Sequence, residues 1–143
     1  MARYDATVPS TWTQEQTFDY LADFRHVAEW DPSIPEVTLI EGTPGALGAV
    51  YEVWLEVLGR NTPLLYRCVE HERPARLVFR AETDHVTSTD TITIGRGAEG
   101  TTVTYDAQLD LRGLREVADP VADVALTRAS ERAKRGLEVT LAG

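Results

Sequence analysis

Strand-like patterns that follow one another, with only short turns between them, are the feature that most constrains this fold. They occupy most of the stretch from Glu36 to Leu111, and several alternate cleanly, as in VYEVWLEV and TTVTYDAQLDL. Alternation with a period of two is typical of strands that bury one face. Turn-forming segments such as TPGALG and GRGAEG separate the strands. Because strands joined by short turns pair with their neighbours in opposite directions, the sequence predicts an antiparallel sheet of consecutive hairpins.

A first strand and two short helices precede this region. ARYDATV alternates as a half-buried strand does, and Pro9 and Ser10 are expected to end it. Thr13 and Gln16 then have the spacing of a capping box, which predicts a helix that runs to about Ala22. A second short helical turn leads into EWDP, where the prolines forbid further helix.

A long helix is expected after the sheet. Asp119 is an N-cap residue and Pro120 suits the first helical position, so the helix is predicted to begin there and to run to about Leu141. One long helix must cover the apolar face of the sheet, and the predicted class is therefore α+β. The expected buried stripe of this helix is rich in small side chains, which either let the helix pack closely on the sheet or leave space between them: Leu126, Ala129, Ala133, Gly136, Leu137 and Leu141.

Composition limits the class of protein and its partners. The 143 residues predict a single domain that spans 1–143, and 43% hydrophobic with 26% charged residues is ordinary for a globular protein. The net charge of −9 argues against nucleic acid as a partner, because phosphates require a basic surface. No apolar run is long enough for a membrane span, and the first ten residues lack the apolar region of a signal peptide. The single cysteine, Cys68, fits a reducing compartment, so we expect a cytoplasmic location.

The inward face of each strand follows from its alternation. Tyr51, Val53 and Leu55 share the apolar face of one strand, opposite Trp54 and its flanking acids. In PLLYRCVEHE both faces carry apolar residues. The face with Tyr66 is preferred as the inner one, because that choice leaves Arg67 in water.

The segment HVTSTDTITI alternates less regularly than the other strands, because polar residues share its apolar face. Val86, Ile92 and Ile94 mark the inner face of this strand, but Ser88 and Asp90 lie in the same register. A buried carboxylate costs several kcal/mol unless it is paired or protonated. Either these groups bond to neighbouring strands with a purely structural role, or they line a pocket with apolar walls and a few polar groups.

Signals for cofactors, metals and nucleophiles are absent or fail in context. GRGAEG matches a dinucleotide fingerprint literally, but a strand follows it where a phosphate site needs a helix N-terminus. Cys68 and His71 are three residues apart on a predicted strand, so they are expected to point to opposite faces and not to share a metal ion. We therefore expect no metal and no cofactor.

The segment VPSTWTQEQTFDYLADFRHVAEWDP resembles the N-terminal signature of the SRPBCC superfamily, in its polyketide cyclase/dehydratase-like branch. GALGAVYEV, VEHERPARLVFRAE and GTTVTYDAQLDL continue the resemblance over nearly the whole chain. The resemblance implies a helix-grip fold. In that fold a curved seven-stranded antiparallel sheet surrounds a long C-terminal helix, and two short helices follow the first strand. It also implies that Trp30 lies beside a cavity mouth, as a packing anchor or as a ligand contact.

The expected function is to bind an apolar small molecule, of polycyclic or polyketide-like type, between the sheet and the C-terminal helix. If the chain is an enzyme, acid–base chemistry of the cyclase/dehydratase type is expected, with Asp90, Tyr66 and Tyr105 as the candidate catalytic residues. The alternatives are a lipid or quinone carrier without chemistry and a protein-interaction module with a vestigial cavity. The outward Trp54 is the sequence feature that favours the module, and either a monomer or a homodimer is expected. The candidate ligand-binding residues are Trp30, Tyr51, Val53, Leu55, Tyr66, Phe79, Ser88, Asp90, Tyr105, Ala133 and Leu137.

Overall fold

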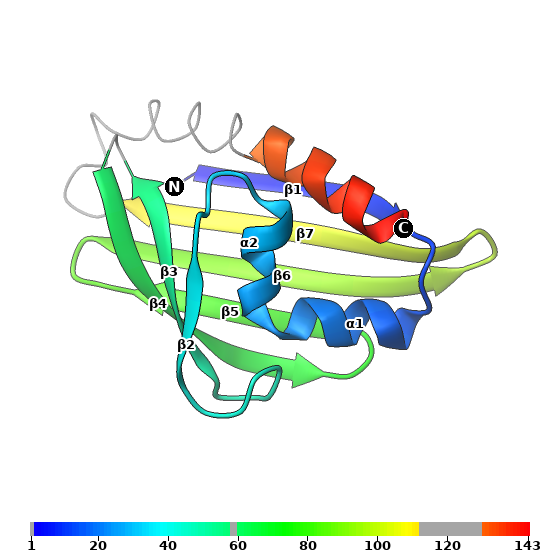
Figure 1. Cartoon of the computed structure of the whole chain (residues 1–143), viewed down its shortest axis with the longest axis horizontal. Coiled ribbons are helices and arrows are strands. Elements are labelled where there is room, and N and C mark those ends of the chain that lie inside the picture. The colour runs from blue at the N-terminus through cyan, green and yellow to red at the C-terminus, as the bar shows by residue number, and fades with distance from the viewer. Residues whose placement is uncertain (1, 58–59, 112–129) are drawn as a thin grey trace.

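The computed structural model describes residues 2–57, 60–111 and 130–143, and it contains one seven-stranded sheet with helices on one side of it (Figure 1). The sheet order is β1-β7-β6-β5-β4-β3-β2, and every neighbouring pair is antiparallel. The consecutive hairpins predicted from the sequence are confirmed, and the first strand closes onto the last. The strands are β1 Ala2–Ser10, β2 Val37–Glu41, β3 Val50–Val57, β4 Arg60–Glu72, β5 Arg76–Glu82, β6 Val86–Gly97 and β7 Gly100–Leu111.

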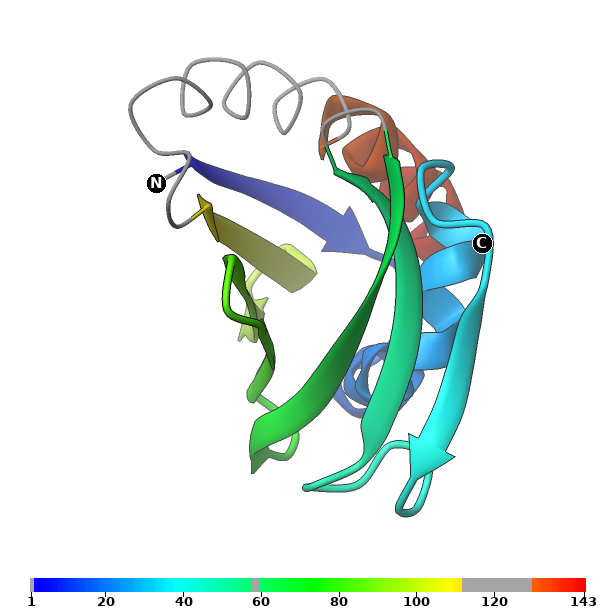
Figure 2. The same cartoon turned by 90° about the vertical axis from the view of Figure 1, so that its left-hand side faces the viewer.

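The sheet is strongly curved, and β7, β6 and β5 stand opposite β3 and β2 (Figure 2). The curvature turns the inward side chains of distant strands toward one another. The largest fully buried side chains come from five of the strands, from α1 and η1, and from the C-terminal helix: Tyr51, Phe18, Phe24, Phe79, Leu64, Leu77, Ile92, Ile94, Leu137, Leu141, Val53 and Val103.

Three short helical elements connect β1 to β2. They are α1 Gln14–Ala22, the 3-10 turn η1 Phe24–His26 and α2 Val27–Trp30. The predicted capping box is present, because the Thr13 side chain accepts from the Gln16 N–H and the Gln16 side chain accepts from the Thr13 N–H. Two orphan donors at the start of α1 are thereby satisfied.

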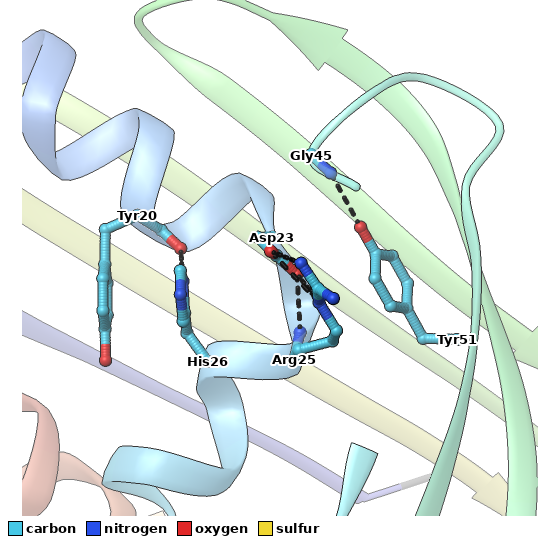
Figure 3. A network of polar contacts seen from close by, with 6 residues as sticks. All are labelled: Tyr20, Asp23, Arg25, His26, Gly45 and Tyr51. Atoms are coloured by element: carbon cyan, nitrogen blue, oxygen red, sulfur yellow. Dashed lines mark hydrogen bonds and ion pairs between the residues drawn. The ribbon is translucent and has the colours of Figure 1, made fainter. Parts of the chain in front are cut away.

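A polar network stabilises the bend after α1 (Figure 3). The Asp23 carboxylate caps η1 by accepting the Arg25 N–H, and it also pairs with the Arg25 guanidinium at 2.7 Å. The His26 ring stacks on Tyr20 with centroids 4.3 Å apart and bonds the Tyr20 carbonyl through Nδ1. These contacts fix the direction in which the chain leaves α1 and therefore the position of α2.

The described part of the C-terminal segment is helical over residues 130–141. The predicted start at Asp119 and the stripe positions Leu126 and Ala129 lie outside the described residues, so a long helix is not confirmed. Leu137 and Leu141 are buried as predicted. No helix in the described part of the chain is long and apolar enough to cross a membrane.

The C-terminal helix and α2 approach each other closely at Gly136. An alanine Cβ at this position would lie 1.9 Å from the Trp30 carbonyl oxygen. The backbone of α2 therefore occupies the place where any larger residue would project. This close packing is against α2, so it does not decide between the two predicted outcomes, which concerned packing of the helix on the sheet.

One expectation about β4 is wrong. Cys68 pairs with Phe79 and His71 pairs with Leu77, and both partners lie on the buried face of β5. A bulge between Cys68 and Glu70 inserts an extra residue, so Cys68 and His71 share the inner face instead of pointing apart. The His71 ring packs edge-on against Phe18 and bonds the Gly45 carbonyl oxygen through Nε2.

Candidate functional site

The inward register predicted for β6 places polar groups on the concave side of the sheet. Asp90 lies between Phe79 of β5 and Ala107 of β7, and Ser88 lies between Ala81 and Leu109. Phe79 and Ala81 are buried, so the two polar residues are on the inner face as predicted. The inner register of β4 is also as preferred, since Tyr66 is 4% exposed.

Asp90 is paired with Tyr105 across β6 and β7. The Tyr105 hydroxyl donates a hydrogen bond of 2.6 Å to Oδ2 of Asp90, and both side chains are half-buried. Burial raises the pKa of Asp90 to about 7, although the hydrogen bond from Tyr105 lowers it. The negative charges of Asp31 and Asp106 raise it further. Burial also holds the pKa of Tyr105 well above its usual range, so its proton stays in the hydrogen bond.

Tyr66 and Ser88 form a second polar pair, although β5 separates their strands. The Tyr66 hydroxyl donates to the Ser88 Oγ at 2.6 Å, and both side chains are buried. Ala81 lies opposite Ser88 on the intervening strand, and its small side chain lets the tyrosine reach across. Burial raises the pKa of Tyr66 above its usual range.

Trp30 lies beside the first pair. Its ring is edge-on to Tyr105 with centroids 5.5 Å apart, and the side chain is 5% exposed, which fits the packing role, one of the two that the family resemblance implied. Its buried Nε1–H has no hydrogen-bond partner among the described residues. A buried donor without a partner costs about 1–3 kcal/mol, so this orphan needs an explanation.

Asp31 is the residue of this region that the sequence reasoning missed as a functional candidate. Burial raises the pKa of its carboxyl, whereas hydrogen bonds from the Ser33 N–H and hydroxyl, both to Oδ1, lower it. The signal in the sequence was the segment DPS, an acid two residues before a serine, which is typical of a side chain that caps its own turn. We call the following residues the inner polar cluster: Trp30, Asp31, Tyr66, Ser88, Asp90 and Tyr105.

The other candidate ligand-binding residues divide by burial. Tyr51, Val53, Phe79 and Leu137 are at most 2% exposed, and Ala133 is 8% exposed. The Tyr51 hydroxyl is used within the fold, because it accepts the N–H of Gly45 at 3.0 Å (Figure 3). These five side chains belong to the packed core of the structure as described.

One end of the inner face is less completely covered than the other. Val103 at one end of β7 is 0% exposed, whereas Tyr105, Ala107 and Leu109 further along the same face are half-buried. Leu55, on the opposite side of the curved sheet, is also half-buried. Half-buried inward positions therefore include the β7 residues next to Asp90, and also Val37, Leu39 and Leu55 on β2 and β3.

Trp54 lies on the outer face of β3, as predicted, and is 37% exposed. Its Nε1–H donates to Glu52 at 3.2 Å. It borders a surface hollow of about 340 Å³, which is also lined by Pro35, Glu36 and Asn61. Among the described residues, no group of three or more His, Cys, Asp and Glu side chains is arranged to hold a metal ion.

Solved structures of similar shape extend over almost the whole chain. Major latex-like protein 151 from Panax ginseng is 14% identical, has a TM-score of 0.75, and the match covers 99% of this chain and 98% of that one. A START superfamily protein from Mycobacterium smegmatis is 14% identical with a TM-score of 0.74, and the match covers 98% and 95% of the two chains. The protein TTHA0849 from Thermus thermophilus is 14% identical with a TM-score of 0.76 and the same coverage.

The sequence itself matches a family model. No curated protein matches the chain, but the model described as polyketide cyclase/dehydrase and lipid transport matches residues 1–142. The resemblance to the SRPBCC superfamily is confirmed by this match together with the START-like and latex-like neighbours. The chain therefore belongs to the polyketide cyclase/dehydrase and lipid transport family.

Proposed function

We propose that the protein binds an apolar small molecule between the curved sheet and the helices, with the inner polar cluster as its polar contact. The observation that carries the proposal is the incomplete covering of the inner face around Asp90. Tyr105, Ala107 and Leu109 face inward but remain half-buried, whereas Val103 on the same face of β7 is fully buried. Apolar walls with a few convergent polar groups are the usual composition of a small-molecule site. The family fits this reading, since its description includes lipid transport.

Native mass spectrometry of the freshly purified protein, compared with its denatured mass, is the direct test. We expect an added mass that is lost on denaturation, because an apolar ligand held against the inner face of the sheet leaves slowly for water. Replacing Ala107 with Phe should abolish the added mass, since the larger side chain would occupy the inner face beside Asp90. Replacing the outward neighbour Gln108 with Phe is the matched control and should leave the added mass unchanged.

Both variants need a thermal unfolding curve, so that loss of ligand is not confused with loss of fold. A folded Ala107→Phe protein that still carries the added mass would contradict the proposed location. A clean mass for the wild-type protein, with no binding of any apolar probe, would contradict the function itself.

Acid–base catalysis is a second candidate function, because the pKa of Asp90 is about 7. A carboxyl that titrates near neutral pH can remove a proton from the carbon next to a carbonyl and return it to a β-hydroxyl, which then leaves as water. The acid is regenerated and no cofactor is consumed. Asp90→Asn should abolish such a dehydration, and a variant that retained full turnover would exclude Asp90 from the chemistry.

A further inference from the structure

The inner polar cluster has an unbalanced charge. Asp31 follows α2 and Asp90 lies on β6, and the charges of both acids act on the ionisation of Tyr66 and Tyr105. No cation is paired with Asp90 among the described residues. Arg132 acts on Asp31 alone. Among the described residues, Arg132 is the one cation that acts on either acid, so the described part of this region is unfavourable for any further negative charge.

The hydrogen bonds of the cluster leave acceptor capacity at Asp90. The Tyr105 hydroxyl donates its hydrogen bond to Oδ2 of Asp90. Among the described residues, no group donates a hydrogen bond to Oδ1 of Asp90. The Tyr66 proton is committed to Ser88 and does not reach Asp90. A carboxylate can accept about four hydrogen bonds, so Asp90 retains sites for a donor from outside the chain.

Aromatic rings add to this environment. Trp30 and Tyr105 meet edge to face at 5.5 Å, and the Phe24 and Tyr66 rings have centroids 5.2 Å apart. A cation near an aromatic face gains about 0.5–2 kcal/mol, with the larger value in desolvated surroundings. Trp30 is an independent sign of a missing partner, because its Nε1–H is buried without an acceptor in the part of the chain that the structure describes. An acceptor atom of a bound molecule would satisfy it, whereas a protonated amine, which has no lone pair, would not.

Resting on the proposed function, we propose that the bound molecule carries a protonated amine, which donates a hydrogen bond to Oδ1 of Asp90 against the ring of Tyr105. Asp31 strengthens the attraction through its charge. A carboxylate or phosphate on the ligand would meet two acids and is disfavoured. A neutral ligand of the same shape fills the same region but gains nothing from either charge.

Three probes with one apolar body and different charges test this inference. They are naphthalen-2-ylmethylamine, naphthalen-2-ylmethanol and 2-naphthoate, titrated into the full chain by isothermal titration calorimetry at about pH 8. We expect the amine to bind about tenfold more tightly than the alcohol, which corresponds to about 1.4 kcal/mol, and the carboxylate to bind most weakly. Below about pH 6 the preference for the amine should shrink, because Asp90 becomes protonated. The groups that face Asp90 and act on its ionisation are Tyr105, Asp31 and Asp106, and Arg132 acts on Asp31.

Asp90→Asn keeps the shape of the side chain and removes its charge, so it should lower the affinity for the amine to the level of the alcohol. Asp110→Asn on the outer face of β7 is the matched control and should preserve the difference between the two probes. Equal affinity of the wild-type protein for amine and alcohol would overturn this inference and leave the proposed function standing. If none of the three probes binds, the proposed function fails and the inference falls with it.

Discussion

At the scale of single residues, Asp90 should make the stability of the protein depend on pH. Its pKa is about 7 in the folded protein against an ordinary value of 3.8, so between these values the folded state holds a proton that the unfolded state releases. The stability contribution is therefore present at low pH and lost as pH rises toward about 8. The full shift corresponds to at most about 4 kcal/mol, and partial exposure reduces the expected loss to about 2 kcal/mol.

Asp90→Asn should consequently stabilise the protein by about 2 kcal/mol at pH 8 and by clearly less at about pH 5.5. Urea denaturation of both proteins at the two pH values measures this. Asp110→Asn, on the outer face, should show no such pH-dependent gain. A gain that is equal at both pH values would indicate that the Asp90 carboxyl does not titrate in this range.

Gly136 is the second residue whose substitution should have a clear effect on stability. Gly136→Ala should destabilise the protein by about 2 kcal/mol, because the new Cβ would lie 1.9 Å from the Trp30 carbonyl oxygen. This net loss includes the gain of about 1 kcal/mol that alanine normally brings to a helix. Gly97→Ala is the control, since a Cβ there meets nothing within 4 Å. Thermal denaturation of both variants measures the difference, and equal stability of the two would mean that the helix can shift away from α2 without cost.

The inward direction of Asp90 could be predicted from the sequence, because strand alternation fixes which side chains share a face. The hydrogen bond between Asp90 and Tyr105 was only one of several possible arrangements, because it depends on the register between β6 and β7. Asp31 could not be placed at all. Its position depends on how the segment after α2 folds back against the sheet, and no local pattern encodes that path.

At the scale of elements, the capping box of α1 predicts a measurable contribution to stability. Thr13→Ala should cost about 1 kcal/mol, because it leaves the Gln16 N–H without its acceptor at the helix start. Thr13→Ser keeps the hydroxyl and should restore most of the loss. Chemical denaturation measures both variants. Equal losses for alanine and serine would assign the effect to the threonine methyl group instead of the hydrogen bond.

Element types were predictable, but irregularities within them were not. Pro9 and Ser10 were expected to end the first strand, whereas β1 extends through Ser10 and pairs Pro9 with Thr102. The proline is tolerated because β1 is an edge strand, whose outer side needs no ladder hydrogen bonds. The bulge in β4 that brings His71 to the inner face likewise has no sequence signature, since it arises from how two strands fit the curvature.

At the scale of the whole molecule, the order of the elements determined the fold more firmly than any single motif did. Six strands in hairpin succession allow few arrangements, and the sheet follows the predicted order from β2 to β7. The family resemblance implied that β1 belongs to the sheet but gave it no neighbour, because sequence patterns do not specify which distant edges pair; the structure places it beside β7. The cytoplasmic location and the choice between monomer and homodimer stay predictions.

The pairing of β1 with β7 also has a consequence for the order of events in folding. Ala2 pairs with Leu109 and Ser10 pairs with Thr101. The first strand therefore has no neighbouring strand until β7, the last strand of the sheet, has formed. The hairpins from β2 to β7 can form locally, one after another, as they leave the ribosome. Because closing the long loop to β1 has an entropic cost that no local contact offsets, we expect the pairing of β1 to be among the slower steps of folding. Until that closure, the edge of β7 remains open to pairing with another chain.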